Sequence, residues 1–367
     1  MEFTIQREAL LNGIQIVQNA ITQKSSLPIL SNILMEVSPT SVTLIATDLD
    51  MGISARVPLV SGDVGAITIP AKKFFDIIKS LQENSDVNIA IKKNNSISIR
   101  AGKAMFKIIG LPKEDFPELP MFEDKDSIMV EQKDLKNMIT AVDFSSSKDD
   151  ARHILTGVLF VIKEDELTMV TTDGRRMSLV TKKMSKKTLV DKKMVIPTKT
   201  IQEVKRLLKD EGEAKLQFND NQIIFNLSNC FIISRLIEGE YPDYEKVIPA
   251  KIENTIKVDK NEFLDALKRV SILTDQDSQA IKINIQNKKI TISKNKPYLE
   301  KAREEVNADY KGETEIEIGF NPKYLIDVLK NIEMENIEME INGYNKPGVI
   351  RKEKEAVYVV LPMQIAS

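Results

Sequence analysis

Cysteine, histidine and tryptophan are almost absent from this sequence of 367 residues, which has one Cys, one His and no Trp. A single cysteine, Cys230, excludes an internal disulfide, and a single histidine, His153, excludes zinc sites built from two or three histidines. The chain also lacks an apolar run of the roughly 18–20 residues that a membrane span needs. Its first residues, MEFTIQREAL, contain no apolar signal core. We therefore expect a cytoplasmic protein that does not associate with membranes.

The motifs of common enzymes are missing as well. The sequence contains no Gly-x-x-x-x-Gly-Lys-Ser/Thr phosphate loop, no Gly-x-Gly-x-x-Gly and no Gly-x-Ser-x-Gly. Its 52 basic and 54 acidic residues give a net charge of −2, whereas a simple nucleic-acid binder is usually basic. The composition thus argues against both a familiar enzyme and a simple DNA-binding protein.

The sequence repeats itself at an interval of about 125 residues. Phe3, Ile128 and Ile256 occupy corresponding positions in three strand–turn–helix segments. The apolar stripes that follow are Leu10, Ile14 and Val17, then Leu135, Ile139 and Val142, then Phe263, Leu267 and Val270. Their common spacing of i, i+4 and i+7 predicts one amphipathic helix in each copy.

A second helix in each copy is predicted by the aligned segments IPAKKFFDIIKSL, IPTKTIQEVKRLL and FNPKYLIDVLKNI. Pro70, Pro197 and Pro322 lie near the starts of these helices, where a missing N–H loses no intrahelical hydrogen bond. The six helix windows together contain 15 basic and 7 acidic residues, although the whole chain is slightly acidic. This segregation predicts a basic helical surface that attracts a phosphate backbone without reading its sequence.

Between the helices, period-two alternation predicts antiparallel strands and hairpins. Examples are residues 41–59, 87–102, 166–184 and 282–295. Polar residues interrupt the apolar pattern near 121–126 and 250–255. We therefore predict an α+β fold of three repeated units with two helices and antiparallel sheets each, over residues 1–122, 123–250 and 251–367.

Nine segments, spread in order over the whole chain, resemble the bacterial DNA polymerase III β subunits, the sliding processivity clamps. They are LPILSNILMEV (27–37), ATDLD (46–50), PAKKFFDI (70–77), DFPELP (115–120), RHILTGVLF (152–160), TTDGRRMSLV (171–180), SRLIEGEYPDYEKVIP (234–249), EIGFNPKYLIDVL (317–329) and YVVLPMQI (358–365). The threefold repeat adds to the specificity of this resemblance.

The resemblance implies a head-to-tail homodimer, closed into a six-unit ring whose helices line a hole for duplex DNA. It implies a sliding clamp that gives the replicative polymerase processivity and has no catalytic residues, metal or cofactor. The implied partners are duplex DNA, a second copy of the chain, the DNA polymerase III α subunit, other polymerases, an ATP-dependent clamp loader, and repair and mismatch-repair factors. They would meet the clamp in the cytoplasm, at the nucleoid.

The resemblance also implies a partner pocket, which would bind peptides with Leu and Phe anchors between the second and third units. Its residues would be Leu155, Thr172, Gly174, Arg175, Arg176, Met177, Pro242, Val247, Asn321, Tyr324, Val359, Val360, Leu361, Pro362, Met363 and Ile365. Arg175 stands where relatives often have His, and Gln364 where they often have Arg.

Two further surfaces follow from the resemblance and the charge pattern. The DNA surface would comprise Lys24, Lys72, Lys73, Lys79, Lys148, Arg152, His153, Lys199, Lys205, Arg206 and Lys209. At the seam between protomers, Phe106 and Ile108 of one chain would meet Ile272 and Leu273 of the other. Around them Lys73, Arg100 and Lys103 would face Glu300, Glu304 and Glu305.

Two alternative functions remain at this stage. One is a carboxylate-dependent nuclease that uses Asp48, Asp50 and Asp173. The repeat argues against it, because Asp48 and Asp173 are 125 residues apart at equivalent positions, as structural turn residues would be. The other is a repeat-built scaffold that does not bind DNA, whose activity would survive charge reversal at Lys199, Lys205 and Arg206.

Overall fold

The computed structural model describes residues 1–21, 27–120, 126–184, 188, 190–251, 254–275, 279–286, 288–295, 300–310, 312 and 314–365. Within these residues the chain forms six α-helices: α1 (Arg7–Val17), α2 (Ala71–Ser80), α3 (Gln132–Val142), α4 (Thr198–Leu207), α5 (Lys260–Ser271) and α6 (Pro322–Asn331). No helix in the described ranges is long and apolar enough to cross a membrane.

The chain folds into two compact units. The first comprises Met1–Lys133 and Gln202–Leu236, and the second comprises Asp134–Ile201 and Ile237–Ser367.

The first unit contains two antiparallel sheets. One has the order β5 (Ser61–Gly62), β1 (Glu2–Gln6), β7 (Asp86–Ile91), β8 (Ser96–Ala101) and β9 (Ala104–Ile109). The other has the order β10 (Asp126–Glu131), β15 (Glu213–Phe218), β16 (Gln222–Asn226), β17 (Cys230–Arg235), β4 (Met51–Pro58), β3 (Ser41–Thr47), β2 (Asn32–Val37) and β6 (Gly65–Pro70).

The second unit is built on one long sheet. Its order begins with β14 (Lys192–Pro197), β11 (Gly157–Lys163), β12 (Glu166–Thr172), β13 (Arg176–Lys183), β25 (Ala356–Val360), β24 (Gly348–Lys352) and β23 (Asn336–Ile341). It continues through β18 (Thr255–Asp259), β21 (Lys301–Tyr310), β20 (Lys289–Asn295), β19 (Ile281–Gln286) and β22 (Ile316–Phe320).

Strands pair across the borders of the sequence repeats. In the first unit β17 pairs with β4, with Ser234 opposite Met51. In the second unit β13 pairs with β25, with Arg176 opposite Val360. The central repeat therefore gives four strands to each unit. For this reason the chain forms two compact units although its sequence contains three repeats. The unit boundaries predicted from the sequence remain a prediction.

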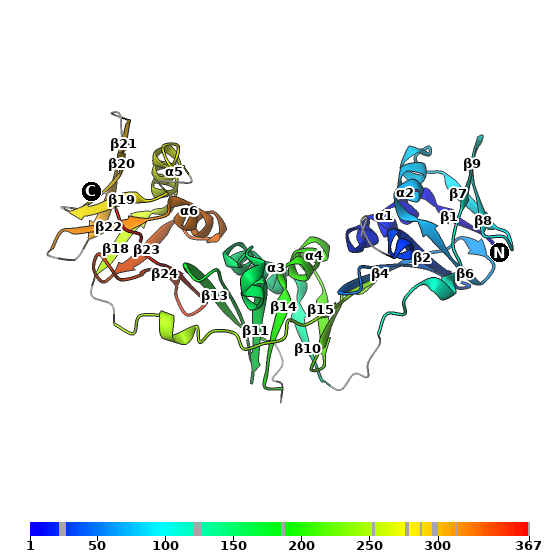
Figure 1. Ribbon diagram of the computed structural model, residues 1–367, viewed down its shortest axis with the longest axis horizontal. Coiled ribbons are helices and arrows are strands. Elements are labelled where there is room, and N and C mark those ends of the chain that lie inside the picture. Colours follow the sequence, from blue (N-terminus) through cyan, green and yellow to red (C-terminus); the bar gives the residue numbers. More distant parts are fainter. Residues whose placement is uncertain are drawn as a thin grey trace. The chain divides into compact units, whose positions relative to one another are not determined.

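The predicted helix stripes are buried. Leu10, Ile14 and Val17 of α1 are fully covered, as are the corresponding residues of α3 and α5. In α2 the deep residues are Phe74 and Ile78, whereas Ile77 is only half-buried. Each first-repeat and third-repeat helix pair, α1 with α2 and α5 with α6, packs together beside its own strands (Figure 1).

Arg7, at the start of α1, connects the two helices of the first repeat. Its guanidinium is buried and donates from Nε to the carbonyl oxygen of Ile78 at 3.2 Å and from Nη2 to that of Lys79 at 2.8 Å. The last carbonyls of a helix lack their usual helical partners, so Arg7 gives the Lys79 carbonyl a donor and adds a second donor to that of Ile78, which also accepts the N–H of Leu81 at 3.4 Å. Its positive charge also complements the helix C-terminus.

Arg7→Ala is expected to lower the free energy of unfolding of the first unit by about 2–3 kcal/mol, because two helix-end carbonyls lose charge-assisted hydrogen bonds. The measurement is the shift of the urea midpoint. Lys72→Ala, which removes an exposed side chain of α2, is the control and should change stability by less than about 0.5 kcal/mol. Equal effects of the two substitutions would contradict this role of Arg7.

Candidate functional site

The partner pocket is organised by the turn between β12 and β13. Thr172 donates from Oγ1 to the carbonyl oxygen of Arg176 at 2.6 Å. Asp173 Oδ1 accepts the N–H groups of Arg175 and Arg176 at 2.9 and 3.0 Å. Gly174 has a φ of +83°, a conformation that glycine adopts without steric cost. Thr-Asp-Gly therefore builds a self-bonded turn, as Asx chemistry predicts.

Residues 361–365, here called the tail segment, lie between this turn and the third repeat. The N–H of Leu361 donates to the carbonyl oxygen of Arg175 at 2.9 Å. The N–H of Met363 donates to the carbonyl oxygen of Gly319, on β22, at 2.8 Å. The tail segment thus extends the pairing of β13 with β25 and then crosses to a different strand. Leu361, Pro362 and Met363 remain half-exposed, and Ile365 is exposed.

The floor beneath the turn is apolar. It consists of the buried residues Leu159, Val170, Met177, Val195, Ile237, Val349 and Val359, against which Tyr241 and Tyr244 pack. Met177, Val359 and Val360, which the sequence suggested as lining residues, are at most 3% exposed. Met177 and Val359 lie opposite each other and belong to this floor, whereas Val360, the next residue of β25, points to the other face of the sheet and is buried there. Leu155 is also buried, whereas Pro242 and Val247 are exposed beside this floor.

Arg176 is the charged centre of this region, and it is only 9% exposed. It donates from Nε to Asp173 Oδ2 at 3.1 Å, from Nη1 to Asp327 Oδ2 at 2.6 Å, and from Nη2 to the carbonyl oxygen of Phe144 at 2.5 Å. Its guanidinium carbon lies 4.6 Å from the ring centroid of Tyr324. The side chain therefore fixes the turn to α6 and is not free to bind a ligand by charge.

Two pocket residues of the third repeat are placed by α6. Asn321 caps this helix by accepting the N–H of Lys323 at 3.0 Å, and its Nδ2 donates to Gln279 Oε1 at 3.2 Å. Tyr324 lies under Arg176. Asn at the cap and Pro at the first helical position are the usual start of a helix, so the sequence FNPKY dictates this geometry.

Burial raises the pKa values of the two phenols near the pocket. Desolvation raises the pKa of Tyr358 to about 12, and its ring stacks on Phe144 with centroids 6.3 Å apart. Desolvation also raises the pKa of Tyr241 well above its ordinary value. Neither side chain carries charge at neutral pH, so both contribute apolar area and shape.

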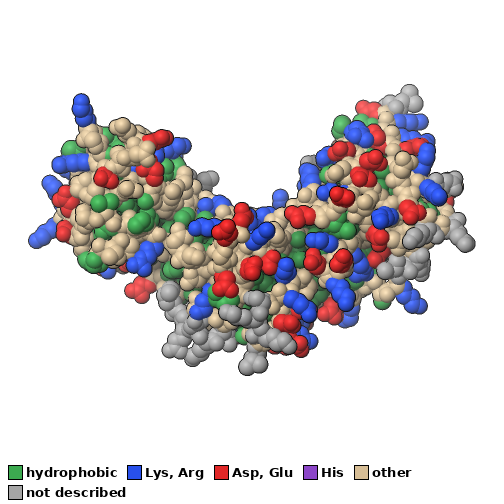
Figure 2. Space-filling view, turned by 180° about the vertical axis from the view of Figure 1, so that it is seen from behind, with side chains coloured by type: hydrophobic (Ala, Val, Ile, Leu, Met, Phe, Trp, Pro, Cys, Tyr) green, Lys and Arg blue, Asp and Glu red, His purple; other side chains and the backbone are tan. Residues whose placement is uncertain are grey.

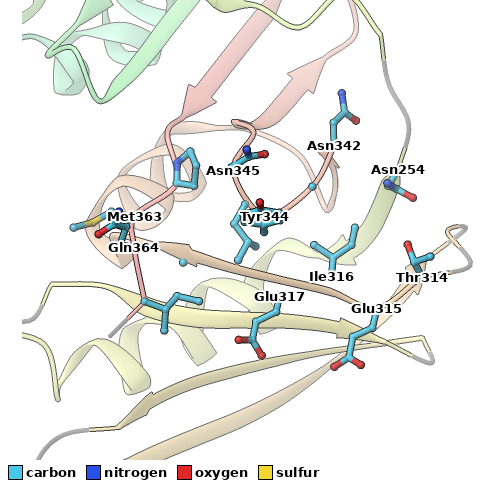
Figure 3. Close-up of a pocket in the computed structure, with 15 residues that line it drawn as sticks. Asn254, Thr314, Glu315, Ile316, Glu317, Asn342, Tyr344, Asn345, Met363 and Gln364 are labelled. Atoms are coloured by element: carbon cyan, nitrogen blue, oxygen red, sulfur yellow. The ribbon is translucent and has the colours of Figure 1, made fainter. Parts of the chain in front are cut away.

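On its other side, the tail segment lines an open cavity of about 970 Å³ in the third repeat (Figure 3). Pro362, Met363 and Ile365 line it together with β22 and the loop that carries Asn342, Tyr344 and Asn345. Tyr344 is 74% exposed. This loop was not among the residues predicted to form the site. An exposed tyrosine between Gly343 and Asn345 was the only signal in the sequence, and it is a weak one.

The predicted DNA surface is largely exposed. Lys72, Lys73 and Lys79 project from α2, and Lys199 from α4, while Lys205 is half-buried. Lys148, His153 and Lys209 are exposed as well. Lys24 lies outside the described residues. On the face that Figure 2 shows, basic and acidic side chains are interspersed.

Arg206 of α4 has a structural role that the sequence did not reveal. It donates from Nε to Glu203 Oε2 at 2.8 Å and from Nη1 and Nη2 to the carbonyl oxygens of Gln15 and Ile16 at 3.2 and 2.8 Å. Glu203 in turn accepts from Asn19 Nδ2 at 2.9 Å. Arg206 thus caps the end of α1, and its donors are engaged in the first unit.

Arg152, also expected on the DNA surface, lies next to the partner pocket. A Cβ added at Gly174 would be 2.5 Å from Arg152 Nη1. Its Nε is also 3.7 Å from Asp149 Oδ2. Its guanidinium therefore lies against the turn that carries Gly174.

Four of the predicted seam residues lie on two incompletely paired strands, Phe106 and Ile108 on β9 and Glu304 and Glu305 on β21, whereas Ile272 and Leu273 follow α5. β9 is the edge of its sheet, and β21 pairs with β18 only over residues 308–310. Phe106 and Ile108 are half-buried opposite the core residues Ile99 and Ile97 of β8. Met105 and Ile109 point to the other face and are 62% and 63% exposed. Neither residue was predicted at the seam, although the alternation of β9 contains that signal. Ile272 is 78% exposed.

The acidic seam residues already have partners within the chain. Glu304 accepts two hydrogen bonds from Arg269, at 2.8 and 2.9 Å, and these hold the pKa of its carboxyl below the usual value. Hydrogen bonds from Lys289 and Arg303 lower the pKa of Glu305 in the same way. Lys73, Arg100, Lys103 and Glu300 are exposed. Any ion pair across a seam would therefore compete with these existing contacts.

The chain matches three family models in succession. They describe the N-terminal, central and C-terminal domains of the DNA polymerase III beta subunit, and they match residues 1–120, 129–243 and 245–364. The chain belongs to the DNA polymerase III beta subunit family.

Relatives in this family match the chain from end to end. A beta sliding clamp of Proteus mirabilis is 33% identical, and that of Escherichia coli K12 is 32% identical, each with 100% of both chains covered. The DNA polymerase sliding clamp of Bacillus subtilis, a solved structure, has a TM-score of 0.96 at 31% identity, with 100% of both chains covered. A Pseudomonas aeruginosa sliding clamp bound to griselimycin has a TM-score of 0.95 at 31% identity and the same coverage.

These matches confirm the expectations of an α+β fold with three repeated domains and of a sliding clamp in DNA replication. The chain is accordingly a non-catalytic processivity factor. The contacts of the aspartates agree with this assignment. Asp48 Oδ1 accepts the N–H groups of Asp50 and Met51, as Asp173 does in its own turn. No group of three or more potential ligands that could hold a metal occurs in the described ranges.

Asp327→Ala should destabilise the second unit by about 2–4 kcal/mol, because it leaves the nearly buried Arg176 guanidinium without its closest carboxylate. Thermal or urea unfolding measures the effect. Asp134→Ala is the matched control: it breaks a pair with Lys182 whose side chains are 29% and 44% exposed, and should cost less than about 1 kcal/mol. If both variants unfold at the same point, Arg176 is not the charged centre of the pocket.

Proposed function

We propose that this clamp binds peptide segments of its partners in the partner pocket and so tethers DNA polymerases to duplex DNA. The observation that supports this most directly is the tail segment. It is fixed by backbone hydrogen bonds at Leu361 and Met363, yet keeps its apolar side chains half-exposed above a buried apolar floor. A rigid apolar surface with few polar groups suits extended peptides with large anchors, because little ordering is needed on binding.

The charges near the pocket favour neutral or acidic peptides. Arg175 is exposed, and Arg152 lies beside Gly174, whereas Arg176 is neutralised by Asp173 and Asp327. The first two guanidiniums are thus available at the rim. This arrangement fits the DNA polymerase III α subunit, other polymerases, repair and mismatch-repair factors, and the clamp loader as alternative occupants of one site.

The ring closure that we propose joins β9 of one protomer to β21 of its partner. Both strands present an edge with unused backbone hydrogen-bonding capacity within the described chain, β9 along its length and β21 along residues 301–307. Exposed apolar side chains are available beside the strands, with Met105 and Ile109 on β9 and Ile272 after α5. Pairing two such edges removes the aggregation risk that each poses alone.

Within such a ring, the exposed lysines of α2 and α4 would face the phosphate backbone of the duplex. Lysine on a long flexible stem gives a diffuse, salt-screened attraction that does not fix one register on the DNA. This suits a protein that must slide, since retention comes from closure of the ring. Arg206, which is engaged with α1, would add to the field more than to direct contact. We place this activity in the cytoplasm, at the nucleoid.

A labelled peptide with a Gln-x-x-Leu-Phe anchor should bind the intact chain with micromolar affinity and lose about 2–4 kcal/mol of binding free energy to a version that ends at Leu361. The reason is loss of the Met363 bond to Gly319 and of the apolar tail contacts. Fluorescence anisotropy measures both affinities, and circular dichroism checks that the shortened chain is folded. An intact, folded chain that does not bind would refute the pocket.

The double substitution Ile272→Ala and Leu273→Ala should convert the dimer to monomers of 41.4 kDa at low micromolar concentration, because the seam loses exposed apolar area. Light scattering gives the mass. Glu304→Gln is the comparison, and should weaken the dimer less, since Glu304 is held by Arg269 of its own chain. A double variant that still scatters as a species of about twice this mass would disprove the seam.

A further inference from the structure

The junction of the first and second repeats copies the backbone of the partner pocket. In the second unit the N–H of Leu361 donates to the carbonyl oxygen of Arg175 at 2.9 Å, next to the pairing of β13 with β25. In the first unit the N–H of Arg235 donates to the carbonyl oxygen of Asp50 at 2.9 Å, next to the pairing of β4 with β17. The two strand registers correspond residue for residue.

The turns at the two junctions also correspond, displaced by 125 residues. Thr47 donates from Oγ1 to the carbonyl oxygen of Met51 at 2.9 Å, as Thr172 does to Arg176. The N–H of Leu49 donates to Thr47 Oγ1 at 3.0 Å, as that of Gly174 does to Thr172 at 3.0 Å.

The apolar floor is repeated as well. A cluster in the first unit contains Ile29, Leu34 and Phe116, with Ile45 packed against it. These positions are equivalent to Ile154, Leu159, Tyr241 and Val170 beneath the partner pocket. The segment after Phe116 crosses to β4, because a Cβ on Gly52 would lie 2.5 Å from Leu119 Cδ2. Tyr244 occupies the equivalent position in the second unit and packs against the pocket floor.

The side chains at the rim are different, and one of them is strained. Leu49 takes the place of Gly174 with a φ of +79°, a conformation that bulky residues rarely adopt, and it is 44% exposed. Leu27, 48% exposed, takes the place of Arg152. Arg152 Nη1 lies 2.5 Å from the position of a Cβ at Gly174, so Leu27 and Leu49 stand at the equivalents of two residues that come together in the second unit. An exposed leucine in a left-handed conformation stabilises neither the turn nor the core.

The charge of the rim is reversed as well. Asp50 is exposed where the partner pocket has Arg175. Glu118 is exposed between Phe116 and Leu119, which hold its segment against the floor and β4. The turn at Asp50, residues 113–118 and the end of β17 carry four exposed acidic side chains, Asp50, Glu114, Asp115 and Glu118. They carry two exposed basic side chains, Lys113 and Arg235. The balance is acidic and would favour a basic ligand.

We propose that this surface, defined by Leu27, Leu49, Asp50, Phe116 and Glu118 and here called the first-junction site, binds an extended basic peptide segment with large apolar anchors. The apolar anchors would contact Leu27 and Leu49, and Lys or Arg between them would meet Asp50 and Glu118. The choice of an extended ligand rests on the proposed function of the partner pocket, whose backbone the site shares. The charge preference is independent of it.

The test uses the full chain and two labelled nine-residue peptides, one alternating Leu with Lys and the other Leu with Glu. Fluorescence anisotropy should show that the Leu-Lys peptide binds at least tenfold more tightly than the Leu-Glu peptide. Leu49→Gly should weaken binding of the Leu-Lys peptide at least tenfold. It should not lower the melting temperature of the protein, because glycine accepts the positive φ. Asp50→Lys should reverse the preference between the peptides.

Two controls separate this site from the partner pocket. The version that ends at Leu361 should bind the Leu-Lys peptide unchanged while it loses the Gln-x-x-Leu-Phe peptide. Leu111→Ala alters another exposed leucine of the first unit and should change neither affinity. The proposal is overturned if the intact chain does not bind the Leu-Lys peptide, if Leu49→Gly binds it as the unaltered chain does, or if binding is lost on truncation at Leu361.

Discussion

Backbone pairing across the repeat borders is the constraint on which the rest of this structure depends. β4 with β17 and β13 with β25 turn separate sheets into continuous ones, so the central repeat is part of both compact units. The same pairing positions the segments that follow β17 and β25. The segment after β25 is the tail segment of the proposed partner pocket. Site and architecture therefore share one set of contacts, and a change that weakened the strand pairing would disturb both.

Arg176 shows how a charge can be used to build an apolar site. Its guanidinium is taken up by two carboxylates, a carbonyl oxygen and the ring of Tyr324, so its desolvation is compensated within the chain. The turn is thereby fixed to α6, and the exposed parts of the pocket can remain apolar. The charge that a ligand meets is left to Arg175 and Arg152, which lie at the rim.

Repetition of a unit preserved the backbone and allowed the side chains to diverge. Glycine at position 174 and leucine at position 49 adopt the same left-handed conformation, at φ of +83° and +79°. Glycine does so without cost and leaves space, whereas leucine does so under strain and presents apolar surface. Equivalent turns in one chain thus offer surfaces of different shape and opposite charge.

The helices, the hairpins and the threefold repeat could be predicted from the sequence alone, because apolar periodicity and Thr-Asp turn chemistry are local properties. The burial of Leu10, Ile14 and Val17 follows directly from their spacing. The joining of strands across repeats, the place of Val359 in the buried floor of the pocket and the capping of α1 by Arg206 came instead from the tertiary structure. Those outcomes depend on partners between about 175 and 190 residues away, and no local pattern specifies a partner at that distance.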